Sequence, residues 1–189
     1  PFQKGKAYFV GTKYKSDDFT PYIFKTEDYG KTWKLITAGI PANHFTRCLR
    51  ADKKRKGLLY CGTEYGMYVS YDDGAKWRPL QLNLPVVSIT DLTIKENDLI
   101  VATQGRSFWV LDDLSLIQQY DPVTVSKNLF LADIYPAYRY DGWQNKNVVN
   151  AGMNPPGGVV INYYLKNLSD TSSVTITIRD KNKKDIKKF

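Results

Sequence analysis

A short box of residues occurs twice in this sequence, and its spacing constrains the fold more than any other feature. Residues 26–33 and 70–77 both have the pattern Ser/Thr-x-Asp-x-Gly-x-x-Trp, and they begin 44 residues apart in a chain of 189 residues. A third, degenerate copy lies 40 residues further on, where Asp112 and Asp113 align with the acidic pair of the second box but no Trp follows. A repeat of about 40–45 residues with four short strands is typical of a β-propeller blade.

The sequence around the boxes predicts strands and almost no helix. Short runs that alternate or are apolar are bounded by Gly, Asp and Asn at roughly 8–12-residue intervals. We therefore expect an all-β chain with two to three blades of a partial β-propeller, the first of which begins at its second strand and lacks its inner one. The expected strands of the second and third blades are residues 45–51, 58–63, 67–71, 76–81, 88–94, 99–103 and 108–111.

Each residue type in the box has a structural role. The Asp can accept hydrogen bonds from turn amides, and the Gly can adopt a positive φ without steric cost. The Trp begins the next strand, and we expect it to bury its ring between neighbouring sheets, where its N–H needs a partner. The residues predicted to be structural are Thr26, Asp28, Gly30, Trp33, Ser70, Asp72, Gly74 and Trp77.

With these boxes the chain resembles the Asp-box (bacterial neuraminidase repeat) β-propeller family, which includes sialidases, xyloglucan-active glycosidases and sortilin-type propellers. More narrowly, it resembles large exported bacterial proteins labelled as glycosyl hydrolases with sortilin-like propellers. Residues 57–68 and 102–113 carry this resemblance, which covers residues 6–120. It implies the C-terminal part of such a propeller, with the Asp boxes at its rim and away from the central site. It also implies an exported location: periplasmic, cell-surface or secreted.

The repeat stops after the third box, and the sequence then predicts a change of domain. We expect propeller blades over residues 1–135, a linker over 136–158, and the incomplete start of an immunoglobulin-like β-sandwich over 159–189. The last segment offers two strands, at 159–165 and 174–178. An aromatic group at Tyr138, Tyr140 and Trp143 could stack on sugar rings or cover the seam between the domains.

Charge and composition exclude several classes of protein. The net charge is +8, but it is concentrated in residues 53–56 and 181–189, which we interpret as a solvated loop and a solvated tail rather than a nucleic-acid footprint. The longest uncharged run, residues 148–165, is interrupted by Pro-Pro and Gly-Gly, so no membrane span is expected. One His and two Cys predict no metal site, and we expect no cofactor.

The two cysteines fall on neighbouring strands of the second blade. Pairing Ala51 with Leu58 across the intervening turn places Cys48 directly opposite Cys61. A disulfide between directly facing residues would strain the torsion about the sulfur–sulfur bond. We therefore predict two reduced, buried thiols that face each other across one hairpin.

Candidate site residues follow from propeller geometry, because the loop entering strand one and the loop joining strands two and three open on the same face. Glu64 and Arg106 occupy similar places in successive blades and are predicted to face one cleft. The structural alternative is that these side chains satisfy loop amides and pair with one another. The candidates for the binding face are His44, Arg47, Glu64, Tyr65, Asp91, Gln104 and Arg106.

Two kinds of function remain open. A glycosidase needs two carboxylates about 5–9.5 Å apart, and the fragment shows no complete catalytic set, so its status as an enzyme stays uncertain. The first hypothesis, implied by the resemblance, is a glycan-binding or glycoside-hydrolase-like propeller that is not catalytic as this fragment. The alternative is a sortilin-like propeller that binds protein or peptide, or a scaffold. The expected partners are the remaining blades of the parent chain and a carbohydrate or peptide ligand, with no nucleic acid.

Overall fold

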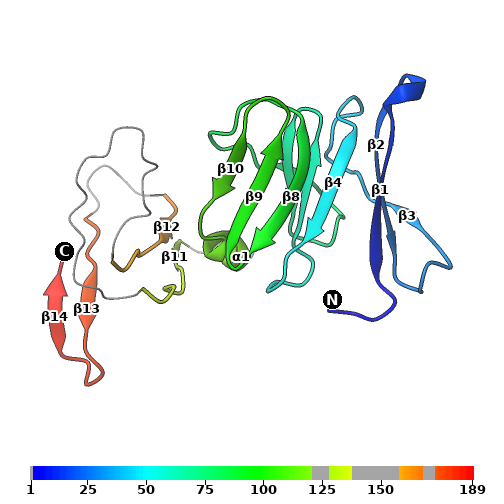
Figure 1. Cartoon of the computed structure of the whole chain (residues 1–189). Coiled ribbons are helices and arrows are strands. Elements are labelled where there is room, and N and C mark those ends of the chain that lie inside the picture. The colour runs from blue at the N-terminus through cyan, green and yellow to red at the C-terminus, as the bar shows by residue number, and fades with distance from the viewer. Residues whose placement is uncertain (1, 121–127, 138–157, 168–172) are drawn as a thin grey trace.

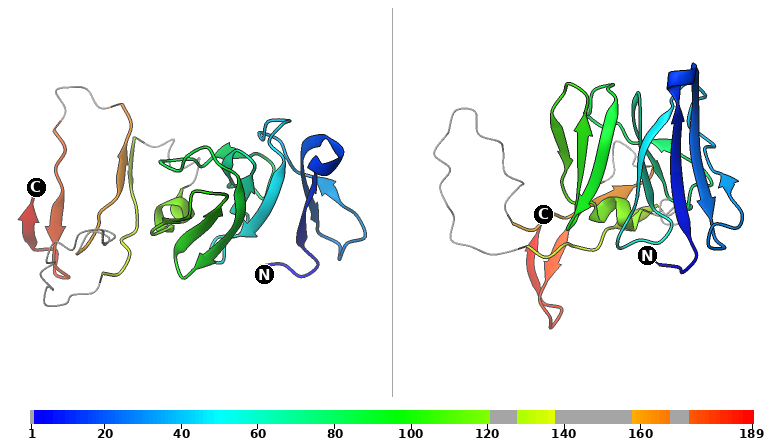
Figure 2. Two further views of the ribbon diagram at one scale, coloured as in Figure 1. Left: turned by 45° about the horizontal axis from the view of Figure 1, so that its top comes forward. Right: turned by 45° about the vertical axis from the view of Figure 1, so that its right-hand side comes forward.

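The computed structural model describes residues 2–120, 128–137, 158–167 and 173–189, and their regular structure is almost entirely β. The strands up to residue 111 form three antiparallel sheets that follow one another along the chain. Figures 1 and 2 show the sheets stacked side by side, with β4 of the second sheet between β1 of the first and β8 of the third. Antiparallel meanders stacked in this way are successive blades of a β-propeller. The predicted all-β propeller fold is therefore confirmed.

The first blade has three strands in the order β1-β2-β3. A short 3-10 turn, η1 (Tyr14–Ser16), connects the first two strands. By their positions relative to the Asp boxes, these three strands correspond to the second, third and fourth strands of the next blade, as predicted. The strands are β1 (Ala7–Lys13), β2 (Asp18–Thr26) and β3 (Lys34–Leu35).

The second blade has four strands in sequence order, and the third has three. The predicted strands are all present, with ends that differ by one or two residues, except that the last strand of the second blade is reduced to two residues. In place of a fourth strand, the third blade continues into helix α1 (Ser115–Gln119). The strands are β4 (Thr46–Ala51), β5 (Leu59–Thr63), β6 (Gly66–Ser70), β7 (Arg78–Pro79), β8 (Ile89–Lys95), β9 (Asp98–Thr103) and β10 (Phe108–Leu111).

Two apolar layers hold the blades together, one at each junction. Every residue of β5 and β6 is buried, because the second blade has a neighbour on both faces. Leu114, which replaces the Gly in the degenerate third box, is fully buried in the second layer. The layer between the first and second blades contains Ile23, Ile36, Ile40, Leu59, Cys61, Tyr68 and Trp77. The layer between the second and third contains Cys48, Leu58, Tyr60, Met67, Val69, Ile89, Leu92, Ile94, Leu99, Val101 and Leu114.

The prediction that the two cysteines face each other is wrong. In the β4–β5 pair, Leu49 lies opposite Cys61, and Cys48 lies opposite Gly62. Neighbouring residues of a strand point to opposite faces, so the two thiols lie in different apolar layers. The register differs by one residue because Leu58 belongs to the loop, where its backbone groups form the turn hydrogen bonds.

Both thiols are free and buried. Burial raises the pKa of Cys48 to about 12 and that of Cys61 well above its usual value. The thiolate is the reactive form of cysteine, and a raised pKa keeps both groups as thiols. In the folded chain they are therefore unreactive and pack as small apolar side chains.

The two Asp boxes form the same tight turn at the edge of the sheets. The hydroxyl of Thr26 accepts the backbone N–H of Gly30 at 2.9 Å, and the equivalent bond in the second box has the same length. Asp28 Oδ1 accepts the N–H of Thr32 at 2.9 Å. Hydrogen bonds, first that from the Thr32 hydroxyl, lower the pKa of Asp28 to about 2. Gly30 and Gly74 both have φ of 85°, which lies in the left-handed region that Gly adopts without strain.

The two box tryptophans have different environments. Trp77 is 2% exposed, and its Nε1 donates to the carbonyl of Ile36 in the first blade at 2.7 Å. Gly39 (φ 98°) lies so close to the Trp77 backbone that a side chain there has no room. Trp33 is 47% exposed and donates to Gly30 of its own turn. The expected burial of Trp33 is not found: the segment after β3, with Ile36, covers Trp77, and no described segment covers Trp33 in this way.

The C-terminal segments form two separate two-stranded sheets. β11 (Leu129–Leu131) pairs with β12 (Tyr163–Leu165), and β13 (Thr177–Arg179) pairs with β14 (Asp185–Lys188). The predicted strands at 159–165 and 174–178 are thus shorter or shifted, and part of the predicted lysine tail is a strand. An immunoglobulin-like sandwich is not confirmed.

The proposed domain boundaries stay predictions. β11 lies inside the range assigned to the blades, yet it pairs with β12 of the C-terminal range. Most of the predicted linker falls outside the described residues, as do Tyr138, Tyr140 and Trp143. No helix among the described residues is long and apolar enough to cross a membrane.

Candidate functional site

One edge of the three blades collects most of the predicted site residues. The β1–β2, β5–β6 and β9–β10 hairpins turn at this edge, where their last pairs are Lys13↔Asp18, Thr63↔Gly66 and Ala102↔Phe108. The Asp boxes follow the other ends of β2 and β6, so they lie at the opposite edge. We call these the loop edge and the box edge.

An arginine held between aromatic rings lies at the loop edge. Arg47 Nε donates to Glu64 Oε2 at 2.6 Å, with both side chains about one-quarter exposed. The Arg47 Cζ is 5.6 Å from the ring centre of Tyr14 and 5.1 Å from that of Phe45. The charge-assisted hydrogen bond and the two cation–π contacts fix the guanidinium in one orientation. The remaining N–H groups of Arg47 are therefore held in fixed directions before any ligand binds.

A histidine and two tyrosines continue the same surface. His44 Nδ1 lies 2.8 Å from the hydroxyl of Tyr68, and the rings of His44 and Tyr65 have centres 4.7 Å apart. Burial lowers the pKa of His44, so its imidazole is neutral near pH 7. Tyr65 is 43% exposed and presents its ring to solvent beside the histidine.

The structure therefore brings four of the seven candidates together, with three aromatic partners that sequence reasoning missed. Tyr14 was missed because it comes from the longer β1–β2 connection of another blade. Side chains alternate between the two faces along β6, and this alternation was the sequence signal that could have placed Tyr68 on the face of the cluster. That Glu64 and Arg106 face one cleft stays a prediction; among the described contacts, Glu64 binds Arg47, and the Arg106 carbonyl bonds within its own hairpin. The loop-edge cluster consists of Tyr14, His44, Phe45, Arg47, Glu64, Tyr65 and Tyr68.

The other three candidates lie on the third blade and have separate contacts. Asp91 Oδ1 accepts from Arg50 Nη2 at 2.7 Å, in a pair with both side chains largely exposed. Gln104 donates its backbone N–H to the carbonyl just before β8. The carbonyl of Arg106 accepts Trp109 Nε1 at 2.8 Å within its own hairpin.

At the box edge, one carboxylate joins the first two blades. Asp73 accepts hydrogen bonds from Lys6, Tyr8 and Lys25, the last at 3.0 Å, and Lys6 also pairs with Glu27 at 3.2 Å. Burial opposes ionisation of Asp73, but the bonds from Lys6, Tyr8 and Lys25 outweigh it and lower the pKa of the carboxyl. Burial likewise opposes the charge of Lys6, while Asp73 and Glu27 raise its pKa. We call Asp73, Lys6, Lys25, Glu27 and Tyr8 the ionic clamp, because together they link the first blade to the second.

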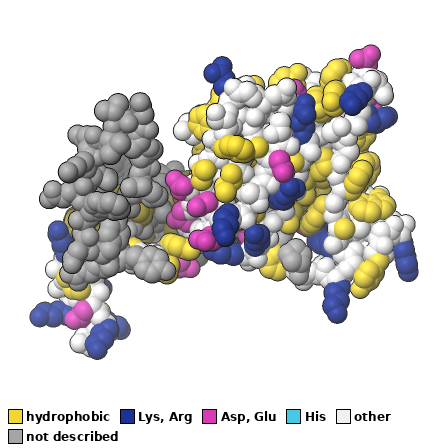
Figure 3. All heavy atoms as spheres, viewed as in Figure 1, with side chains coloured by type: hydrophobic (Ala, Val, Ile, Leu, Met, Phe, Trp, Pro, Cys, Tyr) yellow, Lys and Arg dark blue, Asp and Glu magenta, His cyan; other side chains and the backbone are white. Residues whose placement is uncertain are grey.

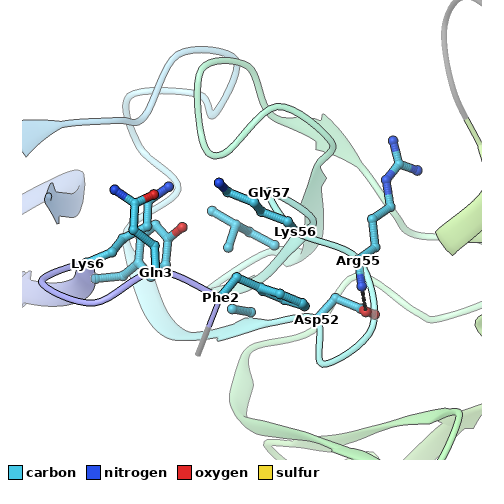
Figure 4. A pocket seen from close by; sticks show the side chains of 10 residues that line it. Phe2, Gln3, Lys6, Asp52, Arg55, Lys56 and Gly57 are labelled. Carbon is cyan, nitrogen blue, oxygen red and sulfur yellow. Dashed lines mark hydrogen bonds between the residues drawn. The ribbon is translucent and has the colours of Figure 1, made fainter.

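A small cavity lies beside this clamp (Figure 4). Its volume of about 110 Å³ is well below the roughly 300–1,000 Å³ of typical ligand pockets. Figure 4 shows the guanidinium of Arg55 pointing away from the cavity. We therefore interpret the cavity as a packing gap between blades. It is lined by Phe2, Gln3, Lys6, Tyr8, Ala51, Asp52, Arg55, Lys56, Gly57 and Leu59.

The basic loop, residues 53–56, is not simply solvated as predicted. Lys53 Nζ donates to the carbonyl of Ile94 at 2.6 Å, and Lys54 Nζ donates to Asn97 Oδ1 at 2.8 Å. Arg55 Nη1 donates to three backbone carbonyls at the C-terminal end of α1. Cations at this end satisfy orphan carbonyls and interact favourably with the helix dipole. The loop fastens the second blade to the third and to α1.

Among the described residues, no group of three or more His, Cys, Asp or Glu side chains is arranged to hold a metal ion. The loop-edge cluster instead offers aromatic and polar side chains. It combines an exposed aromatic ring, fixed N–H donors and one carboxylate acceptor.

Comparisons with known proteins give only distant structural likenesses to parts of this chain. No protein-family model and no curated protein matches the sequence. Among solved structures, an ancestral GH74 enzyme is 17% identical with a TM-score of 0.45, over 56% of this chain and 13% of its own. YCF48, solved bound to D1 peptide, is 21% identical with a TM-score of 0.42, over 59% of this chain and 35% of its own. This chain therefore spans a minor part of both, and likenesses this distant carry no argument about activity.

Proposed function

We propose that this chain contributes three consecutive blades to a larger β-propeller, and that their loop-edge cluster binds carbohydrate. The resemblance of the Asp boxes extends the proposal to an exported bacterial parent protein. The two parts of the proposal rest on different observations.

The outer face of the first blade supports the larger propeller. Phe9 pairs with Phe24 in this blade as Cys61 pairs with Tyr68 in the second, at equivalent distances from the box. Cys61 and Tyr68 contact the preceding blade, whereas Phe9 is 56% exposed. Hydrophobic side chains are visible over the β1–β3 end of the molecule (Figure 3). Together with the exposed Trp33, this face matches the surface that a preceding blade covers.

The main support for carbohydrate binding is the exposed ring of Tyr65, which follows Glu64 of the Arg47–Glu64 pair in the β5–β6 turn. Sugars present C–H faces that pack on an aromatic ring, and hydroxyl groups that both donate and accept hydrogen bonds. Arg47 supplies several donors in a fixed plane, and the Glu64 carboxylate has acceptor capacity beyond its one bond to Nε. The rings around Arg47 keep this pair in place before a ligand arrives.

The proposal is binding rather than hydrolysis. Retaining and inverting glycosidases place a second carboxylate about 5–9.5 Å from the first. Glu64 is engaged by Arg47 at 2.6 Å, which suits a fixed acceptor better than a proton donor. Turnover by the parent protein would draw its catalytic pair from other blades.

A glycan array with the intact chain tests the proposal. Tyr65→Ala should weaken binding at least tenfold, and Tyr65→Phe should retain most of it, because the ring face makes the contact. Tyr29→Ala is the matched control, since Tyr29 is 77% exposed at the box edge. If no glycan binds while a peptide array in the same experiment gives Tyr65-dependent binding, the site is a peptide site and the carbohydrate proposal is wrong.

A further inference from the structure

A second cavity, far from the loop-edge cluster in sequence, lies between α1 and the β11–β12 hairpin. It has a volume of about 500 Å³, within the range of pockets that take small organic ligands. Leu116 and Tyr120 form one wall, and Phe130, Tyr163 and Tyr164 form another. Figure 1 shows α1 beside β11 and β12, where the blades meet the C-terminal segments. Ligand sites favour such seams.

The α1 wall is anchored to the blades. Arg55 holds the carbonyls at the end of α1, including that of Tyr120. The ring of Tyr120 lies 4.7 Å from that of Tyr71, centre to centre. The basic loop therefore fixes this wall before any ligand binds.

The hairpin wall is tied to the helix by a reciprocal pair of hydrogen bonds. Gln119 Oε1 accepts the N–H of Asp133 at 2.6 Å, and Gln119 Nε2 donates to the Asp133 carbonyl at 3.2 Å. Within the hairpin, Phe130 lies opposite Tyr164. The backbone N–H of Lys166 bonds to the Asn128 carbonyl and fixes the end of β12. Both walls are thus held in place by described contacts.

The lining defines the chemistry of the ligand. Its surface is mainly aromatic, and Asn162 and Lys166 are its polar side chains other than the tyrosines. Tyr163 and Tyr164 are 47% and 42% exposed, so their rings retain surface that a ligand can bury. An ammonium at the border of an aromatic cavity complements a planar apolar group that carries one negative charge.

We propose that this seam cavity binds an aromatic carboxylate. The ring of the ligand packs among Tyr120, Phe130 and Tyr164, and its carboxylate accepts a hydrogen bond from the ammonium of Lys166. A free aromatic acid and the C-terminal residue of a peptide share this chemistry. The site is independent of the loop-edge cluster, so it stands whether or not that cluster binds carbohydrate.

Calorimetry and ligand-observed NMR on the full chain test the site with 3-phenylpropionate and its neutral analogue 3-phenylpropionamide. A ligand of this size should bind with a Kd in the high-micromolar to millimolar range. The acid should bind about tenfold more tightly than the amide, as one charge-assisted hydrogen bond allows. A short peptide with a free C-terminal Phe, compared with its amidated form, shows which source of carboxylate the cavity prefers.

Three variants separate the cavity from the rest of the chain. Lys166→Gln should abolish the preference for acid over amide, and Lys187→Gln, on the exposed strand β14, should leave it unchanged. Leu116→Trp should place a bulky ring in the space for the ligand and weaken binding of both ligands, with an unchanged far-ultraviolet spectrum as the check on folding. Equal binding of acid and amide by the natural chain, or a preference that survives Lys166→Gln, overturns the proposal.

Discussion

Replacing each box tryptophan with alanine should have very different effects on stability, although the two residues occupy the same position in the repeat. Trp77→Ala removes a ring that is 2% exposed, together with the 2.7 Å bond from its Nε1 to the Ile36 carbonyl. Loss of a buried Trp costs roughly 3–5 kcal/mol. Trp33 is 47% exposed, and its Nε1 bond lies within its own turn, so Trp33→Ala should cost less than about 1 kcal/mol.

Urea and thermal unfolding followed by far-ultraviolet circular dichroism measure the difference, because this signal does not depend on the removed chromophore. At roughly 2–4 °C per kcal/mol for a chain of this size, Trp77→Ala should lower the Tm by about 6–20 °C, while Trp33→Ala should lower it by a few degrees at most. Similar losses for the two variants would refute the argument. In a longer form of the protein that includes a preceding blade, Trp33→Ala should become as costly as Trp77→Ala.

Three further predictions concern the junctions and the thiols. The lowered pKa of Asp73 means that its ionised form contributes stability above its ordinary pKa of 3.8, which is lost as the pH falls through the lower folded-state value; Asp73→Asn should therefore destabilise the chain at pH 7 and flatten its stability profile below about pH 4. Arg55→Ala should increase amide hydrogen exchange in α1, because three carbonyls lose their donor, and Arg55→Lys should restore part of the protection. Cys48 and Cys61 should resist a thiol reagent in the folded chain and both react in urea, and mild oxidation should produce no intramolecular disulfide while the chain remains folded.

The blade architecture could be predicted from the sequence because its signals are local. Each Asp box contains its own turn chemistry within eight residues, and the strands beside it alternate with period two. The register of Cys48 could not be predicted in the same way. It depends on whether Leu58 closes the loop or begins the strand, because the pairing then runs without a shift from Ala51↔Leu59 to Cys48↔Gly62. A slip of one residue turns every side chain to the other face.

The candidate site was predictable in part for a related reason. His44 and Arg47 lie just before and at the start of β4, Glu64 and Tyr65 form the β5–β6 turn, and the topology of the second blade brings these segments together. Tyr14 comes from a connection whose extra length breaks the repeat. The carbonyls that Arg55 binds lie more than sixty residues further along the chain, where no local pattern indicates a partner. Long-range polar contacts of this kind are specified by the packing of the blades, not by spacing.

The two blade junctions differ in a way that bears on the order of the blades. Relative to the boxes, Lys6 and Lys25 of the first blade occupy the positions that Leu58 and Val69 occupy in the second. Leu58 and Val69 belong to an apolar layer, which accepts any complementary apolar face. The two lysines instead face Asp73, which lowers the cost of placing their charges at the junction.

A blade without an acid at the position of Asp73 would leave both ammonium groups unpaired, which disfavours it as a neighbour of the first blade. Sequence-specific pairing of this kind selects against wrong partners as well as for the right one. The apolar layers therefore supply adhesion between the blades, and the ionic clamp helps to determine which blade follows the first.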